Sequence, residues 1–434
     1  MAEYIKNIHA RQVLDSRGNP TIYTCVETDK NKGVSIVPSG ASTGSREALE
    51  LRDSTDLFNG KSVNKAIINI KETLSPLLNG LDICNQEEID NLMIHKDGTE
   101  SKSTIGANAI LGVSMAAARA GAKSKDLELF EYIRQMYSPS SSSFLLPNPM
   151  FNVLNGGSHA FNSTDFQEFM VVPLGVNNYE ESLLCGFQIY NELKKILEKE
   201  KLPTTLGDEG GFAPPGLTNT EPLELLTEAT EKTSFELGKH VKFALDVAAS
   251  EFYSEDKYKL RSENRSITSD ELIEIYEELS IKYPIYSIED GLSEDDWDGW
   301  KKMTNKIGDK LQLVGDDLYV TQKKYLEKGI KEKSGNSILI KLNQVGTVSE
   351  TIETIKIAQD NKFETIISHR SGETEDTFIA DLAVGTNSAQ IKSGAPARGE
   401  RINKYNRLLI IGDILKSKGL DNNSHKTNSI GEFK

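Results

Sequence analysis

The sequence predicts a protein of the α/β class, in which an N-terminal α+β domain, residues 1–138, precedes a C-terminal βα barrel, residues 139–434. Three observations lead to this prediction. The chain of 434 residues is longer than a single core usually supports. Its first third has strand composition followed by helical periodicity. The rest alternates apolar strand-like runs with amphipathic helical segments, which is typical of a parallel sheet buried on both faces.

The N-terminal domain is expected to begin with a sheet and to continue with helices. Between residues 3 and 38, the turn sequences RGNP at 17–20 and KNKG at 30–33 separate short strand-like segments, which predicts an antiparallel sheet. Four apolar residues then recur at three- and four-residue steps and indicate a helix: Val63, Ile67, Ile70 and Leu74. The stretch YSPSSSS at 137–143 has linker composition, so the domain boundary is placed near it.

Composition and charge narrow the classes of function. Hydrophobic residues make up 37% of the chain and charged residues 26%, which fits a folded soluble protein. Neither a signal peptide nor a membrane span is indicated, so a cytoplasmic location is expected. The three cysteines are far apart, which argues against a disulfide framework. With a net charge of -15, nucleic acid is not an expected partner, and an anionic substrate would require a locally positive pocket.

Ionisable residues recur at one end of the predicted strands of the C-terminal domain. Glu168 stands just before the first strand, and the others stand at the ends of later strands: Asp246, Glu289, Asp316, Lys341, His369 and Lys392. The carboxyl ends of all strands of a βα barrel meet at one face, so these side chains are expected to converge in one pocket. An open doubly wound sheet would also present such strand ends and stays an alternative.

Three of these residues have the chemistry of a metal site. Asp246, Glu289 and Asp316 form a set of hard oxygen ligands that suits Mg²⁺, although three independent helix caps would give the same residues. Lys341 lies inside an apolar run, where burial and nearby cations favour the neutral amine that a base requires. Arg370 and the hydroxyl of Ser371 match the geometry of a phosphate group.

Glycine-rich segments supply further candidates. NGGSHAFNSTDFQEFM at 155–170 carries His159 and Gln167, and GDEGGFAP at 207–214 carries Glu209. Neither segment matches a phosphate-binding loop of the Walker type or the dinucleotide fingerprint, so a nucleotide is not implied. In PSGASTGSRE, the composition around Ser39 by itself favours an ordinary capping loop.

Long and uncommon sequence words run through both domains. They include LDSRGNPT, PSGASTG, GANAILGVS, GDEGGFAP, SIEDGL, IKLNQVGT and SHRSGETEDTFIADLAVG. On these words the chain resembles the enolase family from end to end. The resemblance implies a barrel whose first units depart from βα alternation. It also implies a magnesium-dependent hydro-lyase that interconverts 2-phospho-D-glycerate and phosphoenolpyruvate in glycolysis and gluconeogenesis.

The resemblance also implies a role for each candidate residue. Lys341 takes the role of the base, and Glu209, supported by Glu168, takes the role of the proton donor. Metal binding is implied for two sets of residues, the catalytic Mg²⁺ by Asp246, Glu289 and Asp316, and a second Mg²⁺ that arrives with substrate by Ser39. Substrate contacts are implied for a wider set: His159, Gln167, Glu168, Glu289, Asp316, His369, Arg370, Ser371 and Lys392.

Alternative functions and assembly states stay open at this point. One alternative is another acid dehydratase or racemase of the enolase superfamily, and the wording of GDEGGFAP argues against it. The other is a secondary role as a surface-displayed or secreted protein that binds plasminogen, for which the terminal Lys434 is the only cue. The resemblance implies a homodimer or an octamer built from dimers, and the sequence does not choose between them.

Overall fold

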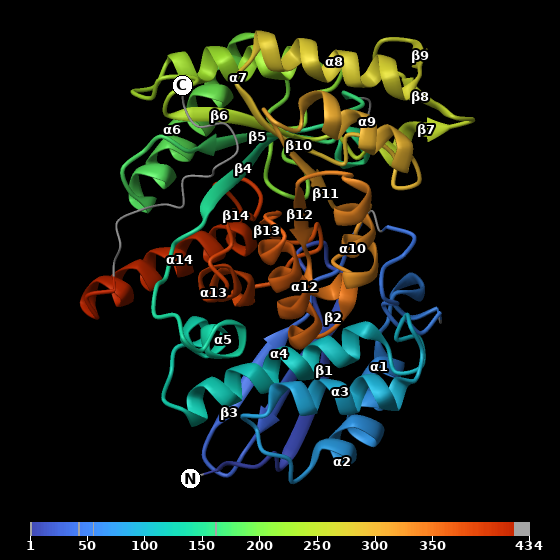
Figure 1. The fold of residues 1–434 in the computed structure, drawn as a ribbon, viewed down its shortest axis with the longest axis vertical. Coiled ribbons are helices and arrows are strands. Elements are labelled where there is room, and N and C mark those ends of the chain that lie inside the picture. Colours follow the sequence, from blue (N-terminus) through green and yellow to red (C-terminus); the bar gives the residue numbers. More distant parts are fainter. Residues whose placement is uncertain (1, 42–43, 55, 161–162, 421–434) are drawn as a thin grey trace.

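The structure is a computed structural model of the chain, and it describes residues 2–41, 44–54, 56–160 and 163–420, without the side chain of His159. Figure 1 shows a small sheet with helices at one end of the molecule and a barrel surrounded by helices at the other. The α5 helix ends at Tyr137 and the first barrel strand begins at Asn148. The domain boundary at residues 138 and 139 stays a prediction.

An antiparallel sheet forms the start of the chain, as predicted. Its strands are β1 (Asn7–Leu14), β2 (Pro20–Glu27) and β3 (Lys32–Ile36). Asp15 closes the turn between β1 and β2, because its Oδ1 accepts from the backbone N–H groups of Arg17 and Asn19 at 2.9 Å each. Between them Gly18 has a φ of +74°, a conformation that glycine adopts without strain.

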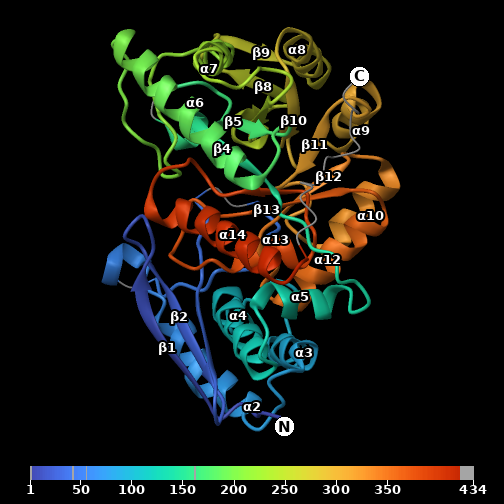
Figure 2. The same cartoon turned by 90° about the vertical axis from the view of Figure 1, so that its left-hand side faces the viewer.

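Helices cover one face of this sheet (Figure 2). The helices of this part of the chain are η1 (Leu57–Gly60), α1 (Asn64–Asn69), η2 (Ile70–Leu74), α2 (Ser75–Leu78), α3 (Gln86–Asp97), α4 (Ala107–Ser124) and α5 (Leu129–Tyr137). The predicted periodicity is confirmed, since Val63, Ile67, Ile70 and Leu74 are all buried. The α4 helix packs so closely on the sheet that a Cβ at Gly33 would lie 2.0 Å from a backbone oxygen of α4.

The second part of the chain forms a closed barrel, so the open-sheet alternative is wrong. The strand order is β10-β11-β12-β13-β14-β4-β5-β6. The bounds are β4 (Asn148–Asn155), β5 (Glu168–Pro173), β6 (Val241–Asp246), β10 (Ile285–Glu289), β11 (Gln312–Gly315), β12 (Ser337–Ile340), β13 (Glu364–Ser368) and β14 (Gln390–Lys392). The sequence interpretation missed β4, a short run interrupted by Pro149.

One barrel strand runs against the others. The β5 strand pairs antiparallel with both β4 and β6, whereas the other neighbouring pairs are parallel. The expectation of a wholly parallel sheet is therefore wrong at this strand. The irregular start that the family resemblance implies is present, since the described residues between β4 and β5 contain no α-helix.

The outer layer of the barrel consists of helices (Figure 1). The long ones are α6 (Tyr179–Lys199), α7 (Glu221–Glu231), α8 (Ser269–Lys282), α9 (Trp297–Ile307), α10 (Lys323–Glu332), α12 (Val348–Asp360), α13 (Phe378–Gly385) and α14 (Gly399–Ser417). Shorter elements are η3 (Gly157–His159), η4 (Ala249–Phe252), α11 (Leu342–Val345) and a small sheet of β7 (Tyr253–Ser254), β8 (Lys257–Leu260) and β9 (Arg265–Ile267). Among the described residues, no helix has both the length and the apolar character needed to cross a bilayer.

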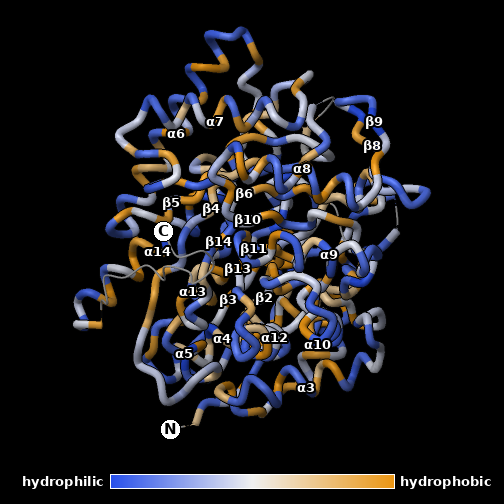
Figure 3. Tube along the Cα trace, turned by 45° about the horizontal axis from the view of Figure 1, so that its top comes forward, coloured by the Kyte–Doolittle hydropathy of each residue, from blue (hydrophilic) through white to orange (hydrophobic). Residues whose placement is uncertain are grey.

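The strands carry the hydrophobic core on both of their faces. Figure 3 shows hydrophobic segments along β4, β5 and β6 near the middle of the molecule. Every residue of β4, β5 and β10 is buried. One cluster of buried side chains draws its members from seven of the eight barrel strands or the residue next to them: Met150, Met170, Val172, Leu174, Ala244, Tyr286, Val314, Leu339 and Ile366. A filled barrel of this kind provides a rigid base on which strand-end side chains can be held.

Ion pairs join the two parts of the chain. Arg119 on α4 forms a fork with Asp376, which lies before α13, at 2.6 and 2.7 Å. The same Asp376 accepts from the backbone N–H of Ile36 at 3.0 Å. Arg407 on α14 likewise contacts Glu128, just before α5, at 2.9 Å. These contacts hold the N-terminal helices and sheet against the barrel.

We predict that Asp376→Ala lowers the free energy of unfolding by about 3 kcal/mol, because it leaves the largely buried guanidinium of Arg119 without its partner. Glu100→Ala is the matched control, since Glu100 and Lys324 form an exposed ion pair that also joins the two parts. Its effect should stay below about 1 kcal/mol. Urea unfolding measures both values, and equal small losses would contradict a stabilising role for the buried pair.

Candidate active site

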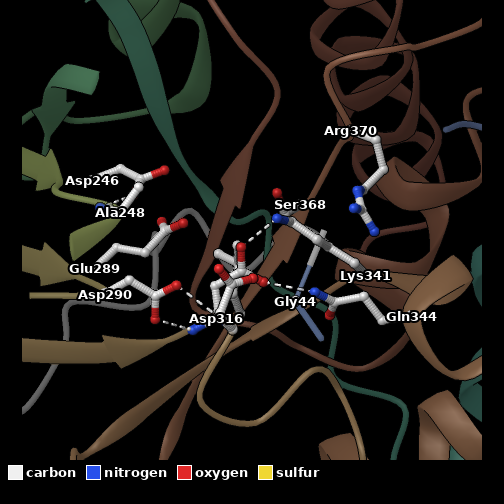
Figure 4. A network of polar contacts seen from close by, with 12 residues as sticks. Gly44, Asp246, Ala248, Glu289, Asp290, Asp316, Lys341, Gln344, Ser368 and Arg370 are labelled. Carbon is white, nitrogen blue, oxygen red and sulfur yellow. Dashed lines mark hydrogen bonds and ion pairs between the residues drawn. The ribbon is translucent and has the colours of Figure 1, made fainter. Parts of the chain in front are cut away.

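The strand-end residues converge at one mouth of the barrel. Asp246, Glu289 and Lys392 are the last residues of β6, β10 and β14. Asp316 and Lys341 directly follow β11 and β12. Figure 4 shows the carboxyl groups of Asp246, Glu289 and Asp290 directed from neighbouring strands toward Asp316. The expectation that side chains scattered along the sequence meet in one pocket is confirmed for Asp246, Asp316, Lys341 and Lys392, which line it. Glu289 is buried and contacts Lys392, but it is not among the lining residues.

Glu168 reaches the same mouth because β5 is reversed. It is the first residue of its strand, and in an antiparallel strand the first residue lies beside the carboxyl ends of its neighbours. In the register of the sheet, Glu168 pairs with Asp246. This explains why the ionisable residue precedes its strand in the sequence here and follows its strand elsewhere.

A buried ammonium group lies at the centre of the carboxylates. Lys392 Nζ lies 2.9 Å from Asp246 Oδ2, 2.9 and 3.0 Å from the two oxygens of Glu289, and 3.2 Å from Glu168 Oε2. All four side chains are nearly inaccessible to solvent. Burial lowers the pKa of Lys392, but the carboxylates, Asp246 first, outweigh it and raise that pKa well above its ordinary value. Lys392 is therefore a permanent cation in this arrangement.

Lys341 contacts the carboxylate of Asp316. Its Nζ donates to Asp316 Oδ2 in a short hydrogen bond. Burial lowers the pKa of Lys341 and the Asp316 charge raises it, with a net increase. Burial likewise raises the pKa of Asp316, but Lys341 outweighs it, and the net pKa is lowered. The expectation of a neutral amine is thus not met in this arrangement, because the carboxylate contact outweighs desolvation.

The loop 207–211 presents Glu209 from the side of the barrel. A backbone hydrogen bond from Gly207 N–H to Gly211 O, 2.9 Å long, closes the loop. Glu209 Oε2 accepts from Asn152 Nδ2 at 3.0 Å and lies 3.2 Å from His369 Nε2. Burial and the neighbouring charge of Glu209 raise the pKa of Glu168 well above its usual range. Two carboxyl groups so placed favour a state in which the pair retains a proton.

Arg370 is held by a residue from the N-terminal part of the chain. Its Nη1 lies 2.9 Å from Glu47 Oε2 and 2.9 Å from Asn343 Oδ1, and its Nη2 lies 3.1 Å from Glu47 Oε1. Gln344 Nε2 donates to Glu47 Oε1 at 3.3 Å and to Asp316 Oδ1 at 2.9 Å. A polar network therefore runs from Arg370 to Asp316.

The remaining predicted residues occupy different places. Gln167 lines the pocket, with its Nε2 3.4 Å from Asp246 Oδ2, and Ser371 also lines it. Ser39 is not among the lining residues, and its hydroxyl donates to Glu50 Oε2 at 2.9 Å. The side chain of His159 lies outside the described residues. Ser39 and His159 as ligands of metal or substrate therefore stay predictions.

Sequence reasoning missed several residues of this site. Asp290 and Asp317 are the second acids of the words IEDG and GDDL, next to the predicted Glu289 and Asp316. Both oxygens of Asp290 accept backbone N–H groups, from Asp316 and Asp317, at 2.9 Å each. In each of these two words a second acid directly follows a predicted one, and this pairing was the sequence signal that could have identified Asp290 and Asp317. Glu47 had no comparable signal, because it enters the site from a distant part of the chain.

The donor set fits a hard divalent cation. Carboxylates outnumber ammonium groups at the barrel mouth, and burial together with Asp246 raises the pKa of Glu289 well above its ordinary value. A further cation would relieve this repulsion. Among the described residues, the one acidic group whose carboxylate oxygens all lie within 4.8 Å of one another is Asp290, Asp316 and Asp317, so the predicted set of Asp246, Glu289 and Asp316 is more widely spaced in this structure. Because Asp290 is engaged with backbone N–H groups, this second trio fits a supporting role better.

Comparisons with known proteins agree with this architecture. Residues 5–133 match the family model described as the enolase N-terminal domain, and residues 143–429 match that of the enolase C-terminal TIM barrel domain. The chain is 53% identical over 409 residues to the enolases of a Nitratiruptor species and of Sulfurimonas denitrificans, covering 94% of this chain and 96% of each relative. It is 52% identical over 412 residues to that of Natranaerobius thermophilus, covering 95% of both chains.

His369 should make the folded protein sensitive to acid. Burial lowers the pKa of His369 to about 4, against about 6.5 in an unfolded chain. Between these values the unfolded chain binds more protons at this site, so the contribution is present above pH 6.5 and is lost as the pH falls toward 4. The total loss is roughly 3 kcal/mol.

The measurement is the free energy of urea unfolding between pH 7 and pH 4 for the wild type and for His369→Asn. The wild type should lose up to about 1.4 kcal/mol per pH unit more than the variant, because only the wild type carries this proton-binding site. The difference between the two slopes isolates His369 from the other titrating groups. Parallel pH profiles would contradict the assignment of a neutral, buried imidazole.

Proposed function

The chain belongs to the enolase family, and from that premise we propose that Lys341 is the base and Glu209 the acid of its reaction. The chain is a hydro-lyase, and it interconverts 2-phospho-D-glycerate and phosphoenolpyruvate. The observation that supports the residue roles best is the shared pocket, which Lys341 and Glu209 line together with Lys392, Asp246 and Asp316.

The first step is the removal of a weakly acidic proton. That proton lies next to a carboxylate, so its removal places more negative charge on a group that is already anionic. Lys341 takes the proton as the neutral amine, a form that Mg²⁺ at Asp316 would favour by offsetting the carboxylate charge that raises the pKa of Lys341. The Lys392 ammonium, whose pKa is raised well above its ordinary value, stabilises the charge that develops. A Lys base combined with magnesium is an established arrangement in this superfamily.

Members of this family use a divalent metal, and we propose Mg²⁺ at Asp246, Glu289 and Asp316. When bound, Mg²⁺ supplies Lewis acidity toward the substrate carboxylate. The carboxylate of Asp316 accepts from Gln344 at 2.9 Å, which fixes its orientation. A second Mg²⁺ that arrives with substrate, held with the help of Ser39, is part of the same proposal.

The second step is the departure of the hydroxyl group as water. Glu209 donates the proton, and Glu168 supports it by keeping a proton within the carboxyl pair, since burial and the Glu209 charge raise the pKa of Glu168. Arg370 and Ser371 are proposed to bind the phosphate, with His159, Gln167 and His369 as further substrate contacts. The planar fork of Arg370, now on Glu47, matches a phosphate equally well.

Assembly, location and secondary binding stay predictions. A homodimer or an octamer of dimers follows from the family resemblance alone, and a cytoplasmic location is the expectation from the sequence. Plasminogen binding has Lys434 as its only cue, and Lys434 lies outside the described residues. Nothing else in the described part of the chain favours that second function.

We predict that Mg²⁺ stabilises the protein against heat and that Asp246→Asn weakens this effect. An excess of about 100 times the dissociation constant corresponds to about 2.7 kcal/mol. Asp246→Asn should raise the Mg²⁺ concentration for half-maximal stabilisation at least about tenfold. Asp317→Asn is the matched control, because Asp317 belongs only to the alternative carboxylate trio, and it should leave that concentration unchanged. The opposite pattern would assign the metal to Asp290, Asp316 and Asp317.

We predict that Lys341→Ala loses both turnover and exchange of the substrate α-proton with solvent, each by about 10²- to 10⁴-fold. Glu209→Gln should lose dehydration to a similar degree and retain exchange, because the base and the Mg²⁺ ligands are intact. Turnover is followed by the absorbance of phosphoenolpyruvate, and exchange by deuterium uptake into 2-phosphoglycerate. Normal exchange in Lys341→Ala would rule out Lys341 as the base.

A further inference from the structure

Arg401 carries a buried guanidinium group that contacts His369, one of the residues that line the pocket. It lies in the first turn of α14, and its side chain is fully buried. Its Nη1 lies 2.7 Å from His369 Nδ1 and donates to Arg370 O at 2.6 Å, while its Nη2 donates to Asp208 O at 3.0 Å and to Ser371 O at 2.5 Å. Arg401 therefore joins the loop that carries Glu209 to the segment that follows β13.

The contact with His369 determines where the imidazole carries its proton. A guanidinium has only N–H donors and stays charged in proteins, so His369 Nδ1 must accept the hydrogen bond. In a neutral imidazole the proton then lies on Nε2. Burial lowers the pKa of His369 to about 4, which keeps the ring neutral near pH 7.

The tautomer of His369 has a consequence for Glu209. With its proton on Nε2, the ring presents an N–H group 3.2 Å from Glu209 Oε2, at an angle too bent for a full hydrogen bond in this arrangement. The same oxygen accepts from Asn152 Nδ2 at 3.0 Å. An oxygen that accepts from one donor and faces the N–H of a second is disfavoured as the protonated one, so the carboxylic proton belongs on Oε1.

We propose that Arg401 is a positioning residue that holds His369 as a donor to Glu209 Oε2 and so directs the acidic proton of Glu209 to Oε1. The inference rests on the proposed role of Glu209 as the acid. Arg401 itself is not among the residues that line the pocket. Its effect on the reaction passes through His369 and through the backbone of Asp208.

The surrounding chain makes room for this side chain. Gly394 follows β14 with a φ of +77°, and a Cβ there would lie 2.9 Å from Arg401 Cδ and 2.6 Å from Glu209 O. The backbone N–H of Ala395 donates to that same Glu209 carbonyl at 2.9 Å. The segment after β14 thus packs at once against Arg401 and against the loop of the acid.

The first test needs no variant of Arg401. Two-dimensional ¹H–¹⁵N spectra of the full-length protein labelled at histidine report which ring nitrogen carries the proton, and His369→Asn identifies the signals of this ring. At pH 7 we expect an unprotonated Nδ1 and a protonated Nε2. A proton on Nδ1, on both nitrogens, or a mixture of tautomers would overturn the proposal.

The second test separates positioning from a merely structural role. Arg401→Lys keeps a donor-only cation at this place, whereas Arg401→Gln offers an oxygen that can accept from Nδ1–H and permits the other tautomer. Arg401→Gln should lower the ratio of dehydration to α-proton exchange at least about tenfold, which corresponds to one donor–acceptor reversal of about 1.4 kcal/mol. Arg401→Lys should restore much of that ratio.

Arg407→Gln is the matched control. Arg407 lies on the same helix and forms a buried pair with Asp381, at 3.0 Å from its Nε, but it does not contact His369 or Glu209. A variant that only reduces the amount of folded enzyme lowers the rates of dehydration and of exchange together, so the ratio of the two rates stays unchanged. An unchanged ratio in Arg401→Gln would overturn the proposal. If neither Arg401 variant folds, the spectra of the wild type decide.

The two tests also separate this inference from the proposed function. If Glu209→Gln retained full dehydration, Glu209 would not be the acid, whatever tautomer the spectra showed. If Glu209→Gln lost dehydration but the spectra placed the proton on Nδ1, the acid assignment would stand and the positioning role of Arg401 would fall.

Discussion

Compensation of buried charge at the barrel mouth is the constraint on which the rest of the structure depends. Lys392 contacts three carboxylates and Lys341 a fourth, in a place with almost no access to water. Any one of these ions alone would be strongly destabilising there. Their mutual placement must therefore be held firmly, and the closed barrel with its filled interior does so. A site that must bind an anion next to carboxylates also requires this balance of cations.

The direction of β5 contributes to the compensation of charge at the barrel mouth. A parallel β5 would place Glu168 at the opposite end of the barrel, because the residue begins its strand. Reversal of this one strand brings Glu168 beside Asp246 and within 3.2 Å of Lys392. The irregular start of the barrel thus has a direct effect on the charge of the site and on the carboxyl pair that Glu168 forms with Glu209.

Groups from outside the barrel strands complete the site. Glu47 comes from the N-terminal part and contacts Arg370, while Arg401 comes from the last helix and contacts His369. Both contacts are made with the segment that follows β13. Glu47 precedes this segment in the sequence, and Arg401 follows it. The buried pair of Arg119 and Asp376 holds the N-terminal part near that segment. The geometry of the site therefore depends on the contact between the two parts of the chain.

The sequence by itself determined the class of fold, the family, and the strand-end residues Asp246, Glu289, Asp316, Lys341 and Lys392, because period and position along a strand are local properties that a sequence displays. Only the tertiary structure decided that the sheet closes, that β4 takes part, and that β5 is reversed, since strand pairing depends on residues far apart in the chain. The same holds for Glu47 and Arg401. Glu47 lies 323 positions from Arg370, and Arg401 lies 32 positions from His369, and no local pattern marks such contacts.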